Sequence, residues 1–215
     1  MLEPCPLCCS SNTVHYTHDK RRSYLQCKDC ELVFVPRNEL LSLEQEKAIY
    51  DTHQNAIDDE GYQRFLNRAA KPLLEELTSP SEGLDFGCGP GPALAYMISQ
   101  HQHNVTLYDI FYYPETSVLN TQYDFVTCTE VIEHVSKPQQ VWQQLYDLVK
   151  PGGLLVIMTK LVIDKERFTH WHYKNDMTHI NFFSQMTFNK LAEQFDMSLK
   201  YVAQDVMLFK KPPMV

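Results

Sequence analysis

The sequence has no long apolar run and little glycine. Its longest unbroken aliphatic stretch, Leu154 to Met158, is far shorter than the ~20 residues that a membrane-spanning helix needs. Only 7 glycines occur in 215 residues, which excludes collagen-like and glycine-rich linker proteins. The first residues carry neither the basic nor the apolar segment of a secretory signal. We therefore expect a cytoplasmic protein with no membrane partner, whose cysteines are reduced thiols or metal ligands.

Basic residues are missing from the middle of the chain. No Lys or Arg occurs between Pro72 and Ser136, although this stretch holds nine carboxylates, and the formal net charge of the chain is -8. Such a stretch places a site within it in a negative potential that disfavours polyanions and tolerates a cationic ligand. The same pattern is explained equally well by surface charge that serves only solubility and happens to be unevenly distributed along the chain. Because binding to a phosphate backbone requires clustered basic residues, and the one cluster is 20–22, we expect no nucleic-acid partner.

Strand and helix patterns alternate along most of the chain. Apolar runs predict strands at 83–86, 105–108, 125–128, 154–159, 198–202 and 206–210, and helices at 43–50, 60–77, 92–100, 139–149 and 184–195. This alternation predicts an α/β fold with a doubly wound, mostly parallel sheet and an antiparallel C-terminal edge. The domain boundaries that follow are 1–37 for a cysteine-rich module, 38–59 for a linker with a helix, and 60–215 for the α/β domain.

A glycine-rich turn follows the strand at 83–86. Gly87, Gly89 and Gly91 lie between that strand and a helix opening at Pro92, so the backbone can turn tightly and approach a ligand closely. Asp109 ends the next strand, where a carboxylate can accept hydrogen bonds from both hydroxyls of a ribose. The alternatives are an ordinary strand–helix turn and an aspartate that caps a loop.

The spacing of the glycines in the turn indicates which class of ligand it can bind. The glycines follow the pattern G-x-G-x-G rather than the G-x-G-x-x-G of dinucleotide-binding proteins, and Asp85 precedes them by two residues. An acidic turn without a nearby base favours a nucleoside that lacks phosphates and carries a sulfonium and an ammonium. That ligand is S-adenosylmethionine.

Four ordered motifs resemble those of the class I S-adenosylmethionine-dependent methyltransferases over about residues 60–211. They are DFGCGPG at 85–91, Asp109, YDFVTCTEVIEHV at 123–135 and LVKPGGLLV at 148–156. The chain is most similar to the subgroup that includes ubiquinone-pathway O-methyltransferases and many small-molecule methylases. The resemblance implies a Rossmann-like sheet and methyl transfer to a small-molecule or carrier-bound acceptor. The residues assigned to the cofactor are Tyr62, Asp85, Phe86, Gly87, Cys88, Gly89, Gly91, Asp109, Ile110, Cys128, Thr129 and Glu130.

The chain departs from the family between the ribose carboxylate and the fourth-motif strand. Only 13 residues, 110–122, stand where the family has a helix and a third strand. We expect that strand to be short or absent, and with it the usual contacts to adenine.

Two segments are candidates for the acceptor side. Glu130, Glu133 and His134 follow the fourth-motif strand, and the resemblance places His134 towards the acceptor. These three side chains could ligate a divalent cation, although a hydrogen-bonded helix start is the interpretation that we favour.

The second segment, 168–183, holds three His, one Trp, one Tyr and three Phe, and it resembles the W-Y-x-x-D-x-T-H-x-x-F-F run of the subgroup. We expect His179 to act as a general base and Asp176 to orient it, with Trp171 and Tyr173 as walls of the acceptor pocket. The alternative is a packed loop with a structural histidine.

Two C-x-x-C pairs lie near the start of the chain. Cys5 and Cys8 are separated by 18 residues from Cys27 and Cys30, a spacing typical of a zinc ribbon. Four thiolates fill the coordination shell of Zn²⁺, so its role would be structural. About 37 residues are too few for an independent core, so the metal would supply folding energy. Unliganded thiols are the alternative.

Two other functions stay open. A Cys-Pro-Leu-Cys ribbon before such a domain also resembles certain ribosomal-RNA guanine methyltransferases, which would make the substrate rRNA or tRNA; the acidity of the chain argues against this. A cofactor-binding or zinc-dependent interaction protein without turnover is the second alternative. The sequence does not name the acceptor, the atom that is methylated or the oligomeric state.

Overall fold

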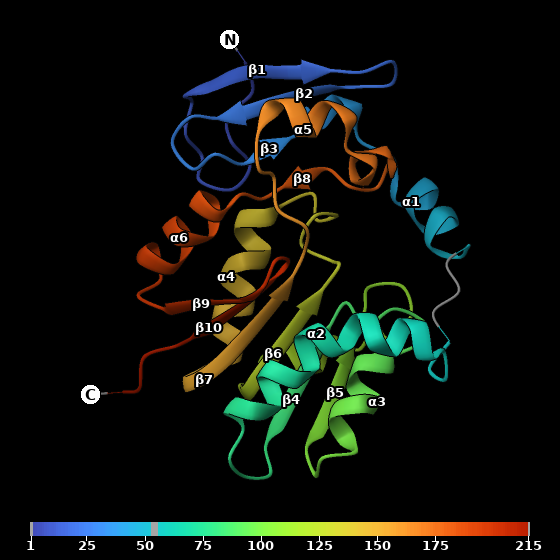
Figure 1. Cartoon of the computed structure of the whole chain (residues 1–215), viewed down its shortest axis with the longest axis vertical. Helices are drawn as coiled ribbons and strands as arrows, with labels where there is room; N and C mark the ends of the chain where they lie inside the picture. Colours follow the sequence, from blue (N-terminus) through green and yellow to red (C-terminus); the bar gives the residue numbers. More distant parts are fainter. Residues whose placement is uncertain (1, 53–55, 215) are drawn as a thin grey trace.

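The computed structural model describes residues 2–52 and 56–214, and these residues form a large sheet with a smaller sheet above it in the view of Figure 1. The large sheet has the strand order β5-β4-β6-β7-β10-β9. Its strands are β4 (Glu82–Phe86), β5 (Asn104–Tyr108), β6 (Tyr123–Thr129), β7 (Val149–Met158), β9 (Ser198–Ala203) and β10 (Val206–Lys210).

The pairing of these strands confirms the predicted topology. β5, β4, β6 and β7 pair in parallel, whereas β10 pairs antiparallel with both β7 and β9. Residues 110–122 contain no strand and hold only the 3₁₀ helix η2 (Thr116–Asn120), so β5 is the edge of the sheet. The prediction that the family's third strand is missing is therefore confirmed.

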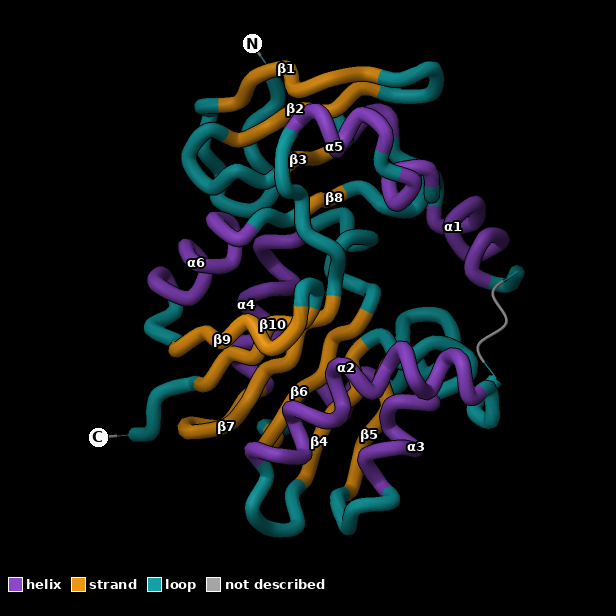
Figure 2. The backbone as a smooth tube through the Cα atoms, in the orientation of Figure 1, coloured by secondary structure: helices purple, strands orange, loops and turns teal. Residues whose placement is uncertain are grey.

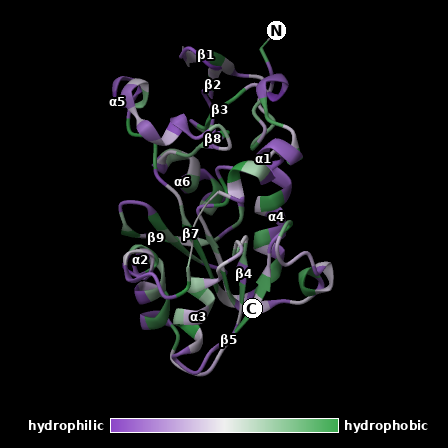
Figure 3. Cartoon of the chain, turned by 90° about the vertical axis from the view of Figure 1, so that its right-hand side faces the viewer, coloured by the Kyte–Doolittle hydropathy of each residue, from purple (hydrophilic) through white to green (hydrophobic). Residues whose placement is uncertain are grey.

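Helices cover both faces of the large sheet. On one face lie α2 (Glu60–Glu76) and α3 (Ala93–Ser99), and on the other lie α4 (Pro138–Leu148) and α6 (Gln185–Gln194). Because strand side chains alternate in direction, Leu154 and Val156 pack under α2 and α3, while Leu155 and Ile157 pack under α4 and α6. Figure 3 shows hydrophobic residues along these strands and hydrophilic residues in the peripheral loops.

Side-chain caps set the helix starts. Asp59 accepts hydrogen bonds from the first backbone amides of α2, and Ser184 forms a capping box with Thr187 at the start of α6. These caps satisfy amides that have no partner within the helix, and they account for the agreement with the predicted starts near residues 60 and 184. No helix among the described residues combines the length and apolarity needed to cross a bilayer.

The smaller sheet joins the N-terminal strands to a short strand from the later part of the chain. It contains β1 (Thr13–His18), β2 (Ser23–Cys27), β3 (Val33–Phe34) and β8 (Asn181–Phe182), all antiparallel, and Figure 2 shows β8 beside the N-terminal strands. Tyr16 and Tyr24 pack with Phe182 and with Phe168 of α5 (Lys165–His170) in one buried cluster. The cysteine-rich module therefore shares its core with the segment that follows β7.

The described part of the predicted linker covers residues 38–52 and 56–59, and residues 53–55 lie outside the described residues. It contains α1 (Leu43–Tyr50), the helix predicted at 43–50, and the end of the 3₁₀ helix η1 (Arg37–Glu39), which begins one residue before the predicted boundary. A further 3₁₀ helix, η3 (His172–Asn175), follows α5.

Candidate active site

A cavity of about 1370 Å³ opens at the carboxyl ends of β4, β5 and β6. Ligand sites of open α/β sheets gather at this edge. The glycine turn and the loops after β5 and β6 form one part of the wall, while α1 and the 173–179 loop, which follows α5, form another. The cavity therefore connects the two halves of the site that the sequence predicted.

The glycine turn is built as the sequence predicted. Gly87 and Cys88 donate backbone hydrogen bonds to the Tyr108 carbonyl, and Gly87 has φ +77°. A Cβ atom on Gly87 would lie 2.3 Å from Cγ2 of Val131, so no larger residue fits. Gly89 has φ +64°, and a Cβ atom there would meet no atom within 4 Å, because Gly89 faces the cavity. The turn thus leaves room for close approach of a ligand.

Asp109 is held rigidly beside this turn. One carboxylate oxygen accepts from Gly89 N at 3.1 Å, and the other accepts from Phe111 N and Tyr112 N at 2.8 and 3.1 Å. A carboxylate offers about four acceptor positions, so about one remains for a hydroxyl group in the cavity. This geometry suits a ribose.

The assigned cofactor residues divide into two groups. Those that line the cavity are Tyr62, Phe86, Gly87, Cys88, Gly89, Asp109, Ile110, Thr129 and Glu130. Asp85, Gly91 and Cys128 do not line it. Asp85 lies buried beneath the turn and accepts a hydrogen bond from Thr127 Oγ1 at 2.7 Å, and burial raises its pKa to about 6. Cys128 is fully buried in the core.

Glu130 stands where the two halves of the cavity meet. Its φ of +53° is unusual for a residue with a side chain, and its Oε1 is buried without a hydrogen-bond partner among the described residues. Burial, reinforced by the nearby Glu133 carboxylate, raises its pKa to about 8. Because strained backbone and unsatisfied buried polar atoms are enriched at ligand sites, Glu130 is a candidate for contact with a ligand.

Beyond Glu130, the acid–base side chains of Glu133, His134, Tyr173 and His179 lie close together. The Tyr173 hydroxyl donates to Glu133 Oε1 at 2.5 Å, and Oε2 of the fully buried Glu133 has no partner among the described residues. His179 Nδ1 donates to the Tyr173 carbonyl at 2.7 Å, and His134 Nδ1 donates to the Thr178 carbonyl at 3.1 Å. Because a carbonyl oxygen only accepts, these bonds assign a donor proton to Nδ1 of each imidazole.

The cluster can share a proton or ligate a divalent cation. Ligand atoms of Glu133, His134 and His179 all lie within 4.8 Å of one another. Glu130, which the sequence grouped with Glu133 and His134, is not part of this set. Residues 132–134 form a turn, so the predicted helix start is absent from 130–134.

The geometry around His179 differs from the prediction in two respects. Asp176 Oδ2 lies 3.9 Å from His179 Nε2, and Asp176 instead accepts hydrogen bonds from Thr178, so the Tyr173 carbonyl orients the imidazole. Trp171 does not line the cavity; it is half-buried and packs on Phe168 and Phe182 at the edge of the core beneath the small sheet. Burial lowers the pKa of His179 to about 4, so at neutral pH its imidazole is uncharged.

Sequence reasoning missed much of the cavity wall, including three residues with polar groups. Glu46 and Tyr50 reach it from α1, which the sequence placed in a linker, and Lys160 reaches it from the residues after β7. Glu46 is 8% exposed, and burial raises the pKa of its carboxyl group. The sequence carried no signal for Glu46 and Tyr50, because they reach the cavity only when α1 folds over it.

The four cysteines of the two C-x-x-C pairs converge as predicted. Their sulfur atoms lie within 4.8 Å of one another, with Cys5 to Cys30 at 3.6 Å and Cys8 to Cys27 at 3.5 Å. Four sulfurs at about 2.3 Å around Zn²⁺ would be about 3.8 Å apart, so the set fits a tetrahedral ion after only small shifts. Cys9 stands outside the cluster and donates to Gln139.

Comparison with known proteins agrees with this geometry. A family model described as a methyltransferase domain matches residues 55–201. The ubiquinone biosynthesis O-methyltransferase of Pectobacterium carotovorum is 33% identical over 132 residues, which cover 47% of this chain and 55% of that protein. The mitochondrial enzyme of the same name from Schizosaccharomyces pombe is 49% identical over 45 residues, 21% of this chain and 16% of that protein. The matches thus span about half or less of these relatives.

Solved structures share the fold at low sequence identity. The 1,6-didemethyltoxoflavin-N1-methyltransferase of Burkholderia thailandensis, solved with its substrate and S-adenosylhomocysteine, has a TM-score of 0.53 at 15% identity and covers 92% of this chain and 99% of its own. The PH0226 protein of Pyrococcus horikoshii has a TM-score of 0.55 at 14% identity and covers 80% of this chain and 100% of its own.

The family model matches about two thirds of the chain, and the sheet order and the glycine turn agree with it. The chain belongs to the methyltransferase-domain family, in the S-adenosylmethionine-dependent class that the sequence motifs indicated.

Proposed function

We propose that this protein transfers the methyl group of S-adenosylmethionine to a hydroxyl oxygen of a small aromatic acceptor. The observation that carries the proposal is the pair Tyr173 and His179, which line the cavity beyond the glycine turn, with the buried Glu133 bonded to the Tyr173 hydroxyl behind them. The relatives named above as O-methyltransferases support oxygen as the methylated atom.

The residues of the turn fit the cofactor. Asp109 would accept a ribose hydroxyl, the open space at Gly89 admits the methionine part, and the unsatisfied Glu130 Oε1 can accept from an ammonium group. The absence of the family's third strand leaves the cavity open beside η2 and α4, where Leu119 and Val141 offer apolar contacts to adenine. The bound cofactor supplies a methyl group that its sulfonium has already activated.

The chain itself then orients the acceptor and removes its proton. The neutral His179 can accept the hydroxyl proton at Nε2, because its Nδ1 is held by a carbonyl group. The bond from the Tyr173 hydroxyl to Glu133 fixes the position of Tyr173, whose carbonyl in turn orients His179. Tyr50 and Phe111 lie 5.8 Å apart between ring centroids and provide aromatic walls for a planar acceptor.

The cysteine cluster would hold a structural Zn²⁺ ion. Three of its four cysteines are buried and the four thiolates fill the shell, so no position remains for a substrate.

The test is a calorimetric titration of the protein with ligand, followed by an assay for transfer of a labelled methyl group. Calorimetry should show binding of S-adenosylhomocysteine and not of NAD, and methyl-labelled cofactor should label a catechol such as 3,4-dihydroxybenzoate, assayed with and without Mg²⁺. Label that appears only in an RNA fraction, or in an amine but not in phenols or catechols, would refute the proposed acceptor class.

A further inference from the structure

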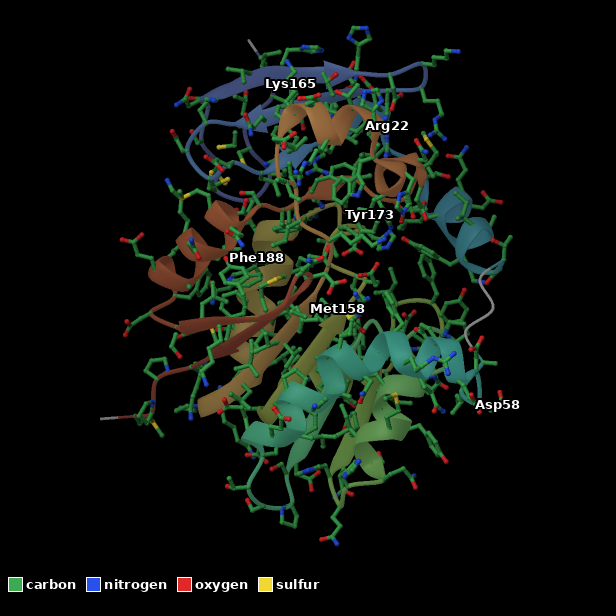
Figure 4. The ribbon with its side chains drawn as sticks, in the orientation of Figure 1. Arg22, Asp58, Met158, Lys165, Tyr173 and Phe188 are labelled. Carbon is green, nitrogen blue, oxygen red and sulfur yellow. The ribbon has the colours of Figure 1, made fainter. Side chains whose placement is uncertain are left out.

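The turn of the N-terminal hairpin contacts the 173–179 loop. β1 and β2 are joined by residues 19–22, and the side chains of this turn reach residues more than 150 positions further along the chain. The two segments belong to different parts of the site: one carries no cavity residue, whereas the other contributes Tyr173, Asp176 and His179 to the cavity wall. Figure 4 shows Arg22 above Tyr173.

Arg22 makes the central contact. Its guanidinium donates to three backbone carbonyls of the loop, those of Lys174 at 2.8 Å, Asp176 at 2.9 Å and Met177 at 3.0 Å. Its Nε donates to the hydroxyl of Tyr24 at 3.1 Å, and the residue is 5% exposed. The planar guanidinium thus satisfies backbone groups that no apolar side chain could satisfy.

Neighbouring side chains hold the same arrangement. Lys174 Nζ donates to Asp19 at 2.8 Å, and Asp19 also accepts from the Tyr24 hydroxyl at 2.9 Å. The exposed Arg21 donates to the backbone and side chain of Asn175. Past the loop, Val33 and Phe34 pair with β8. The loop is therefore fastened to the cysteine-rich module on both sides of His179.

We propose that Arg22 is a positioning residue for the acceptor site. The three carbonyls that it binds lie between Tyr173 and His179, so its guanidinium sets the path by which the Tyr173 carbonyl meets His179 Nδ1. The cysteine-rich module thereby forms part of the acceptor half of the site, while the glycine turn and Asp109 belong to the other sheet. The predicted effect on turnover rests on the proposed function, whereas the predicted effect on the structure of the loop does not.

The experiment compares Arg22→Met and Arg22→Lys with Lys20→Met, a charge-matched control at an exposed position of the same turn. With 3,4-dihydroxybenzoate as the probe, Arg22→Met should lower kcat/KM by about 10- to 100-fold, because small misplacements of catalytic groups have effects of this size. Affinity for S-adenosylhomocysteine and metal content should stay within twofold of the unmodified chain. Arg22→Lys should recover part of the loss, and Lys20→Met should show none.

Hydrogen exchange provides a readout that needs no acceptor. Amides of residues 173–180 should exchange at least tenfold faster in Arg22→Met, while those of 83–91 keep their rates. Unchanged exchange in the loop, equal kcat/KM, or an equal loss of S-adenosylhomocysteine affinity would overturn the proposal. If the unmodified chain labels no phenol or catechol, the acceptor class is wrong, and the exchange rates alone decide the role of Arg22.

Discussion

Three glycines with similar backbone angles should respond differently to substitution by alanine. Gly87, Gly89 and Gly152 have φ of +77°, +64° and +78°. At each, a side chain in the left-handed region costs ~1–2 kcal/mol, offset by ~0.4–1 kcal/mol from the less flexible unfolded chain. Gly89→Ala and Gly152→Ala should therefore each lower stability by about 1 kcal/mol, since neither new Cβ meets an atom within 4 Å.

Gly89→Ala and Gly152→Ala should differ in their affinity for the ligand. Gly89 lines the cavity, whereas Gly152 lies at the far end of β7, where it donates to Lys211 and Pro212. An added methyl group that meets a bound ligand costs ~1–3 kcal/mol, or about 5- to 150-fold in the dissociation constant. Gly89→Ala should show this loss for S-adenosylhomocysteine, and Gly152→Ala should bind as the unmodified chain does.

Gly87→Ala adds a steric clash to the backbone strain. Its Cβ would lie 2.3 Å from Val131, so its loss of stability should exceed that of Gly152→Ala by ~1–3 kcal/mol, and Val131→Ala should restore most of the excess. Urea unfolding and calorimetric titration measure both quantities. If Gly89→Ala and Gly152→Ala bind S-adenosylhomocysteine equally, the turn does not cradle the cofactor as described.

Three further outcomes are expected. His179→Gln should lower kcat by about 10²- to 10⁴-fold with unchanged S-adenosylhomocysteine affinity, because the general base is lost; turnover within threefold of the unmodified chain would exclude this role. Because burial raises the pKa of Asp85 to about 6, the folded state retains a proton that the unfolded chain releases, so Asp85 contributes a fall in the free energy of unfolding between about pH 4 and 6. Urea unfolding of Asp85→Asn should lack this contribution, so its free energy of unfolding relative to the unmodified chain should rise over that range, and parallel pH curves would contradict the assignment. Cys27→Ser should reduce bound zinc from one ion per chain to none, with faster amide exchange in β1 and β2; protected strands without metal would show that zinc does not stabilise the module.

Much of the large sheet could be predicted from local pattern. Apolar runs of strand length, the glycines at 87–91 and the cap at Ser184 act on residues close in sequence, so their consequences can be inferred without tertiary contacts. The shortness of residues 110–122 predicted the missing strand for the same reason, because a helix and a strand cannot fit there. The two C-x-x-C pairs likewise predicted the cysteine cluster.

The acceptor half of the site was decided by contacts across the chain. Neither the pairing of β3 with β8 nor the contact of Arg22 with the 173–179 loop follows from any periodicity, because each joins segments about 150 residues apart. The same is true of Glu46, which a helix in a predicted linker brings to the cavity. The sequence alone determined the glycine turn and the convergence of the four cysteines, whose partners are local or set by spacing. Only tertiary structure decided what surrounds His179, because buried polar groups take whichever hydrogen-bond partners the packed chain places beside them.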